Sequence, residues 1–177
     1  MVLLHHELPD HSSHFDWMLQ RADNPHELLT FRLNHRIDLP ADTLNEFTAE
    51  RLIDHRAIYL EYEGPVQARA GGDGVSNDSF TPPHASHLAP ETMGARGRVR
   101  RLASGTCTIH AESPSRVALH TQFLGQPAQH WLAERADTLS GSPSTPQTRF
   151  TISESSPELW HFRLFQAARS GILEKNV

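Results

Sequence analysis

The chain of 177 residues is poor in the features that would place it outside the cytoplasm or in a membrane. Its single cysteine, Cys107, excludes an intrachain disulfide and any metal site made of several thiolates. No apolar stretch approaches the roughly 20 residues that span a bilayer. The apolar start at residues 1–4 is broken at once by His5, which argues against a signal peptide. We therefore expect a cytoplasmic protein with no membrane contact.

The charge balance gives no positive field that would draw the whole chain onto nucleic acid. There are 16 basic residues against 21 acidic ones, a net charge of −5. Any contact with DNA therefore has to be local. Histidine is abundant, with 13 residues. These histidines indicate metal or phosphate chemistry only where they converge, because scattered histidines are usually solvated surface groups.

The length fits one domain, which we place at residues 1–167. Residues 67–95 lack apolar periodicity and are predicted to be a mobile insertion, and residues 168–177 form a polar tail. Short segments in which apolar and polar residues alternate predict strands. These segments are 1–5, 14–20, 28–34, 57–62, 97–102, 105–111, 115–122, 128–135, 148–152 and 159–165.

The short links between the first three strands predict an antiparallel meander. Residues 41–54 carry apolar side chains at roughly helical spacing, with Asp42 as a candidate cap, and are predicted to form a helix. Many short strands at regular spacing are typical of an antiparallel barrel or sandwich. We predict a mainly β fold, namely an antiparallel β-barrel with one short helix and long polar loops.

A candidate metal site lies at the first predicted hairpin. Residues two apart on a strand face the same side, so His14 and Asp16 present an imidazole and a carboxylate together. His6 precedes the turn and reaches the same face if the two strands pair. His5 takes its place if the register differs, because neighbouring strand residues face opposite sides. Two imidazoles and one carboxylate with open coordination positions suit Mn, Fe or Zn.

A second candidate cluster follows at residues 54–65. His55 and Tyr59 are four apart, so an extended segment would direct both side chains to one face. An imidazole can act as a general acid, and a phenol can donate a hydrogen bond to a phosphoryl oxygen. The alternative is the start of a strand with one half-buried tyrosine, which the spacing alone favours.

Together these blocks resemble the 3′-phosphoesterase domain of bacterial DNA ligase D, in particular its small stand-alone relatives. That family has a His, a short variable turn, His-aromatic-Asp, and later Asp-His-x-x-x-Tyr followed by Glu-Gly. A Gly-x-Val and Gly-Thr hairpin comes after them. The chain carries these motifs as His6, His14-Phe15-Asp16, Asp54-His55 with Tyr59, Glu63-Gly64, Gly97-Arg98-Val99 and Gly105-Thr106. The resemblance covers roughly residues 1–66 and 96–135, and more weakly 148–165.

The resemblance implies a β-barrel that removes a terminal ribonucleoside and then the 3′-phosphate from DNA 3′ ends during repair. By matching position, His6, His14 and Asp16 would hold a divalent metal, typically Mn²⁺, with Zn²⁺ or Fe²⁺ as alternatives. His55 and Tyr59 would contact the scissile phosphate, with His55 as the proton donor. The implied partners are DNA or DNA/RNA 3′ ends, and a separate ligase or polymerase chain for any joining step.

The chain departs from the family pattern at two places. Met18 stands where the family has an Arg two residues after the metal-binding Asp, and a thioether cannot replace a guanidinium on phosphate. Residues 31–35 replace a Trp-x-x-Pro-Lys segment, and either Arg32 or His35 is a candidate to compensate. These departures leave open a non-catalytic relative that binds nucleic acid or a partner. A non-haem iron oxygenase is less favoured, because no Arg lies about ten residues beyond His110 or His120.

Overall fold

The computed structural model describes residues 1–39, 45–66, 94–136 and 157–165. The predicted strand at 148–152 and nearly all of the predicted insertion at 67–95 lie outside these residues. The strands are β1 (Val2–Glu7), β2 (Ser13–Gln20), β3 (Glu27–Leu33), β4 (Glu46–Arg51), β5 (His55–Arg56), β6 (Gly64–Pro65), β7 (Arg98–Ser113), β8 (Arg116–Phe123), β9 (Gln129–Arg135) and β10 (Glu158–Leu164). A 3₁₀ helix, η2 (Ala57–Leu60), follows β5.

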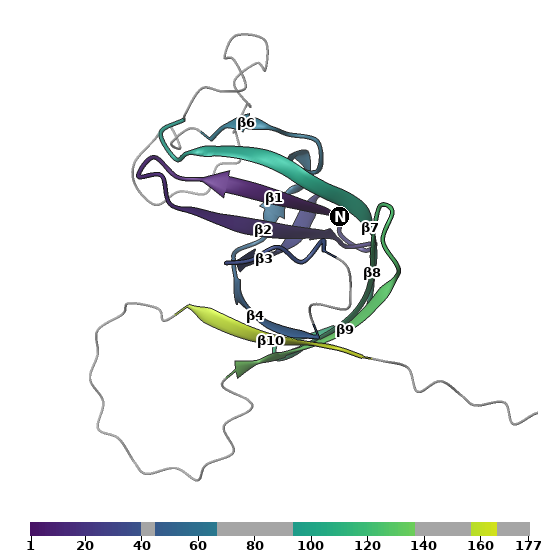
Figure 1. Ribbon diagram of the computed structural model, residues 1–177. Coiled ribbons are helices and arrows are strands. Elements are labelled where there is room, and N and C mark those ends of the chain that lie inside the picture. The colour runs from purple at the N-terminus through teal and green to yellow at the C-terminus, as the bar shows by residue number, and fades with distance from the viewer. Residues whose placement is uncertain (40–44, 67–93, 137–156, 166–177) are drawn as a thin grey trace, which may run out of the picture.

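The strands close into an antiparallel barrel of eight, which confirms the fold class predicted from the sequence. The order around the barrel is β1-β2-β3-β4-β10-β9-β8-β7, and β7 pairs back with β1. Figure 1 shows this ring nearly end-on, with β4, β9 and β10 across from β1 and β2. The short strands β5 and β6 lie outside the ring, paired with β3 and β7.

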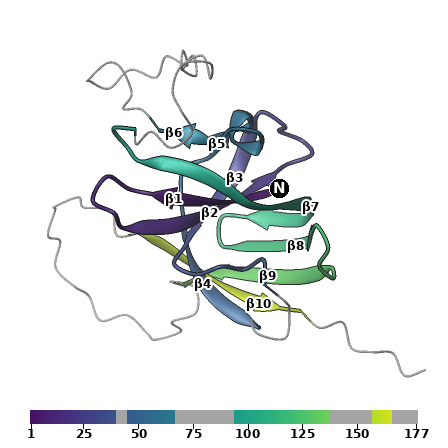
Figure 2. The same ribbon diagram turned by 45° about the horizontal axis from the view of Figure 1, so that its top comes forward.

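Alternation along the strands separates two apolar cores, one on each side of the barrel wall. Inward side chains fill the barrel, and its fully buried aromatic residues are Trp17, Phe31 and Phe162. Outward side chains near β1, including Leu4 and Met18, form a second core. The η2 segment and Val66, which follows β6, pack in this second core. Figure 2 shows β5 close to β3 and β6 next to β7.

The helix predicted at 41–54 is wrong, because residues 46–51 form strand β4. Phe47 and Ala49 point into the barrel, while the side chains between them point out, which is a period of two. Strand β4 pairs with β3 and β10, and the barrel could not close without it. This tertiary pairing outweighs the apolar spacing that resembles a helix. Residues 40–44 are outside the described part of the chain.

The strand predicted at 57–62 is also wrong, because it contains the 3₁₀ helix η2. A 3₁₀ helix repeats every three residues, which brings Ala57 above Leu60, and the turn that follows brings Tyr62 back to the same side. These three residues and Tyr59 pack against the second core, an arrangement that a strand with its period of two would not allow. Residues 97–102 and 105–111 belong to the single long strand β7, which Figure 2 shows curving from β1 to β8. In the described residues, no helix is long and apolar enough to cross a membrane.

Candidate metal centre

The three residues predicted to bind a metal lie together on the outer face of the barrel wall. His6 pairs with His14 across β1 and β2, and Asp16 follows on the same face of β2. The Nδ1 atom of His6 is 3.4 Å from Asp16 Oδ2, and His14 Nε2 is 3.4 Å from Asp16 Oδ1. One ligand atom from each residue lies within 4.8 Å of the others. We refer to these three residues as the triad.

The register of the hairpin settles which of the two neighbouring histidines joins the triad. His6 faces Asp16, whereas His5 packs its ring 5.4 Å from the Phe15 ring on the opposite face of the wall. Strand β1 starts at Val2 and runs to Glu7 without a bulge in its pairing with β2, so the alternation holds to its end. His6 is therefore the candidate ligand.

A backbone carbonyl fixes the position of one proton on the His6 ring. Its Nε2 atom lies 2.8 Å from the carbonyl oxygen of Arg96, and a carbonyl can only accept, so Nε2 carries a proton. The other ring nitrogen, Nδ1, faces the Asp16 carboxylate. The residue after Arg96, Gly97, has a φ of +98°, which favours glycine. A Cβ atom at this position would lie 2.0 Å from the backbone oxygen of Glu7, so no side chain fits there and the chain can keep this path. A ring nitrogen this close to a carboxylate either carries a proton of its own or shares a cation with the carboxylate.

The triad contains polar atoms that the protein itself does not satisfy. Asp16 is only 3% exposed, yet its Oδ1 atom and His14 Nε2 are buried without a hydrogen-bond partner in the described residues. A divalent metal bound by imidazole nitrogens and carboxylate oxygens at about 2.1 Å holds its neighbouring ligand atoms about 3.0–3.5 Å apart. The separation of 3.4 Å from each histidine to its nearer Asp16 oxygen has this spacing, and all three ligand atoms lie within 4.8 Å of one another. The donor set therefore fits a divalent cation.

The electrostatics of Asp16 favour the charged form that a cation requires. Burial by itself would raise the pKa of this carboxyl, but the His14 and His6 imidazoles beside it outweigh burial and lower the pKa well below its ordinary value. Asp16 is a carboxylate at neutral pH. A buried carboxylate with two imidazoles around it is the arrangement expected of a metal ligand set with open positions.

The second predicted pair, His55 and Tyr59, also comes together, although not by the predicted route. His55 lies in β5 and Tyr59 in η2, and their rings meet edge to face with centroids 5.6 Å apart. The Nδ1 atom of His55 donates to the Ile53 carbonyl at 2.9 Å, so its Nε2 atom is the one available to a ligand. The 3₁₀ turn, rather than strand parity, brings the two side chains side by side.

Tyr59 is the link between this pair and the triad. It packs against the second core. That core includes Met18, which is on the same strand as Asp16, and Leu4, which is the partner of Asp16 across β1 and β2. Burial raises the pKa of the Tyr59 phenol; the charges of Arg56 and Arg96 oppose this, and the charge of Asp16 adds to it. The phenol is therefore neutral at physiological pH and lies in the electrostatic field of the triad.

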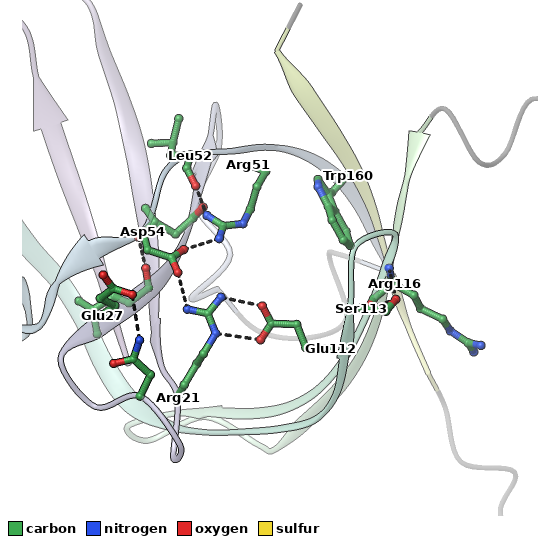
Figure 3. Close-up of polar contacts among 12 residues, drawn as sticks. Arg21, Glu27, Arg51, Leu52, Asp54, Glu112, Ser113, Arg116 and Trp160 are labelled. Carbon is green, nitrogen blue, oxygen red and sulfur yellow. Dashed lines mark hydrogen bonds and ion pairs between the residues drawn. The ribbon is translucent and has the colours of Figure 1, made fainter. Parts of the chain in front are cut away.

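Asp54, the first residue of the Asp-His block, has a structural role. Its carboxylate accepts from Arg21 at 2.7 Å and from Arg51, and Arg21 also pairs with Glu112 on β7 at 2.6 Å. Figure 3 shows the Arg21 guanidinium between the two carboxylates, with the Arg51 side chain on the other side of Asp54. The pKa of Arg21 is raised above its ordinary value. The hydrogen bond to Glu112 raises it most, burial lowers it, and the pairing with Asp54 raises it further. This network fixes the backbone just before His55.

Two departures noted in the sequence have structural counterparts. Met18 is 1% exposed in the second core, so it cannot reach a ligand at the triad. Arg32 lies directly across from Asp16 in the β2–β3 pairing and therefore points to the same face. The sequence analysis did not say on which side of the sheet Arg32 lies. Counting equal numbers of residues along both strands from the turn at residues 23–25 would have paired Arg32 with Asp16. His35, the other candidate, places its ring 5.7 Å from that of Phe47 in the barrel core.

Two arginines of the basic run at residues 96–101 do not face the triad. Arg98 pairs with Glu7 at 2.8 Å, and Arg100 lies across from His5, so both face away from His6.

Comparisons with known proteins add no further assignment, since no protein-family model matches the chain and no curated protein matches it.

Proposed function

We propose that the chain is a divalent-metal-dependent phosphoesterase that processes the 3′ ends of DNA in repair. It would remove a 3′-terminal ribonucleoside or a 3′-phosphate, as in the ligase D domains that its motifs resemble, with Mn²⁺ as the preferred ion. The observation that carries the proposal is the convergence of His6, His14 and Asp16 on the outer face of the barrel wall, where Tyr59 also packs. A ligase or polymerase for subsequent joining would be a separate chain.

The residues of the two clusters would divide the work between them. A bound cation would polarise the phosphoryl oxygens and offset the charge that develops on them. Tyr59, neutral at physiological pH, would donate a hydrogen bond to a phosphoryl oxygen. His55, held through Nδ1 by the Ile53 carbonyl, would present Nε2 and in its protonated form give a proton to the leaving oxygen. His6 and His14 would hold the ion together with Asp16.

The decisive experiment measures metal binding and turnover on the same preparations. Labelled primer–template DNA ending in a 3′-phosphate or a single 3′-ribonucleotide is incubated with Mn²⁺ or with EDTA, and the products are resolved on a gel. We expect Asp16→Ala to lose both Mn²⁺ binding and activity. His55→Ala should keep Mn²⁺ binding and lose about 10²-fold or more in turnover. His130→Ala, on the exposed outer side of β9, is the matched control and should retain both.

A second candidate function is a non-catalytic relative that binds nucleic acid, and the buried Met18 favours it because the triad gains no guanidinium there. The same experiment separates the two functions. Mn²⁺ bound at the triad of the wild-type protein, with DNA binding but no product from either substrate, would decide for the non-catalytic relative. Failure to bind Mn²⁺ at all would overturn both.

A further inference from the structure

A row of outward side chains leads from the triad around the barrel. Asp16 on β2 lies across from Arg32 on β3, Arg32 lies across from Glu50 on β4, and Glu50 lies across from Leu159 on β10. Directly opposed residues of antiparallel strands point to the same face, so the whole row faces outward, as Asp16 does. The triad is therefore one end of a continuous surface over four strands.

This surface is hollowed into a groove of about 430 Å³. The groove is lined by residues of the row and by residues next to it, among them His14, Arg32, Asn34, Thr48, Glu50 and Leu159. His14 belongs to the triad, so the groove opens directly onto the candidate metal centre. Leu159, at the far end, is 42% exposed and offers an apolar surface. The groove combines the ion pair of Arg32 with Glu50, neutral hydrogen-bonding groups and one apolar end, a combination that suits a nucleotide better than a bare ion.

Arg32 is the cation of the groove, and its hydrogen bonds are incomplete. Its Nη1 atom donates to Glu50 Oε2 at 3.2 Å, while its Nε atom is buried without a partner in the described residues. Glu50 therefore holds one part of the guanidinium and leaves another donor unused. Two more unpartnered buried atoms, on His14 and Asp16, lie on the adjacent strand. An anion bound beside the triad cation would satisfy Arg32, since a guanidinium binds phosphate through two parallel hydrogen bonds.

The cavity on the other side of β1 does not reach the triad. It is lined by His5, Arg98 and Arg100, but also by the carboxylates of Glu7 and Glu63. It lies on the face of β1 that carries His5, away from the triad. Of these two cavities, only the groove at Arg32 contains a triad residue.

We propose that Arg32 binds a phosphate of the substrate next to the triad, and that the nucleotide strand leaves the metal centre along the groove over β3, β4 and β10. This assignment rests on the proposed function and specifies how its substrate lies. Arg32 would supply the guanidinium that Met18 does not, from the neighbouring strand. Glu50 would orient the guanidinium, and Leu159 would pack against the sugar or base of the adjoining nucleotide.

Binding of inorganic phosphate and of a 3′-phosphorylated single-stranded oligonucleotide to the Mn²⁺-loaded protein tests this proposal. Arg32→Ala should weaken both by about 10- to 100-fold while Mn²⁺ binding stays unchanged. Arg32→Lys should recover part of the loss, because it keeps the charge but not the paired hydrogen bonds. Arg116→Ala is the charge-matched control, since Figure 3 shows its guanidinium pointing away from the polar contacts around it. Equal binding by Arg32→Ala and the control would overturn the assignment.

The variant Glu50→Gln separates ligand binding from a merely structural ion pair. If Arg32 only supported the fold through Glu50, Glu50→Gln would weaken phosphate binding as much as Arg32→Ala, which would overturn the assignment. If the guanidinium binds the anion, Glu50→Gln should bind phosphate at least as tightly as the wild type, because a competing carboxylate is gone. Phosphate binding that depends on Arg32 without release of product from DNA would leave this inference standing and overturn the proposed hydrolysis. Hydrolysis that is indifferent to Arg32 would do the reverse.

Discussion

Adjacent residues on one strand have unrelated environments here, and His5 and His6 are the clearest case. His6 meets a carboxylate and a carbonyl on the outer face. His5 lies on the other face against Phe15, where burial and then the charge of Arg100 lower its pKa. The neutral form of His5 is therefore favoured, and it has no carboxylate from β2 across from it. At this scale, the side of the sheet decides the chemistry of an imidazole more than its position in the sequence.

The phenols of the two tyrosines give a pH-dependent test at the residue scale. Burial raises the pKa of Tyr59, and burial followed by the charge of Tyr59 raises the pKa of Tyr62. Each folded-state pKa thus lies above the unfolded value of about 10. The stability that the neutral phenols contribute is complete below about pH 10 and declines as the pH rises through the folded pKa. We expect phenolate absorbance to develop only above about pH 10 in the folded protein.

The variants Tyr59→Phe and Tyr62→Phe assign this behaviour to one ring or the other. Urea unfolding as a function of pH should give a flatter decline above about pH 10 for Tyr59→Phe than for the wild type. Triad metal binding should be unchanged in both variants at neutral pH. A phenolate signal below about pH 9 in the native wild type would contradict the buried position of these rings.

At the scale of elements, the network of Arg21, Asp54 and Glu112 ties the end of β2 to the link before β5 and to β7. The Arg21 side chain is 13% exposed, and its removal leaves the partly exposed carboxylates of Asp54 and Glu112 without the cation that they share. We expect Arg21→Ala to lower the free energy of unfolding by about 2 kcal/mol. It should also reduce turnover through misplacement of His55, with Mn²⁺ binding retained.

The double variant Arg21→Ala with Glu112→Gln provides the check. Removing the second charge relieves the repulsion, so the pair should be less destabilised than the sum of the two single variants, as measured by urea unfolding. His55 should still be misplaced in the double variant, because Asp54 has lost Arg21 in both cases. Unchanged turnover in Arg21→Ala would show that this network does not position His55.

Elements with long regular alternation were predictable, and elements defined by tertiary pairing were not. The sequence predicted β1, β2, β3 and β10 to within two residues, because their apolar residues alternate over a full strand. It misassigned β4, where only pairing with β10 distinguishes a strand from a helix. It also misassigned η2, whose side chains turn toward a second core that no local pattern reveals. Strand parity placed His14 and Asp16 together but left His5 and His6 as alternatives, and both that choice and the side of Arg32 depended on the register.

At the scale of the whole molecule, one sheet wall separates the barrel core from the second core, which shares its face with the candidate metal centre. The barrel core holds Trp17, Phe31 and Phe162, whose rings lie 4.9–6.4 Å apart. The second core, on the outer face of β1, β2 and β3, carries the η2 segment with Tyr59. The triad lies on the outer face of the same wall. Stability and site geometry should therefore respond to different substitutions.

Two large-to-small substitutions, one in each core, test this separation. Phe162→Leu in the barrel core should lower the free energy of unfolding by about 1–2 kcal/mol, with turnover per folded molecule unchanged. Leu28→Ala in the second core should cost about 2–5 kcal/mol and also reduce turnover, because Tyr59 loses the apolar surface against which it packs. Mn²⁺ binding should persist in both, since neither residue contacts the triad. If Phe162→Leu reduced turnover per folded molecule as much as Leu28→Ala did, the wall would not separate the two cores, and the barrel interior would itself determine the geometry of the site.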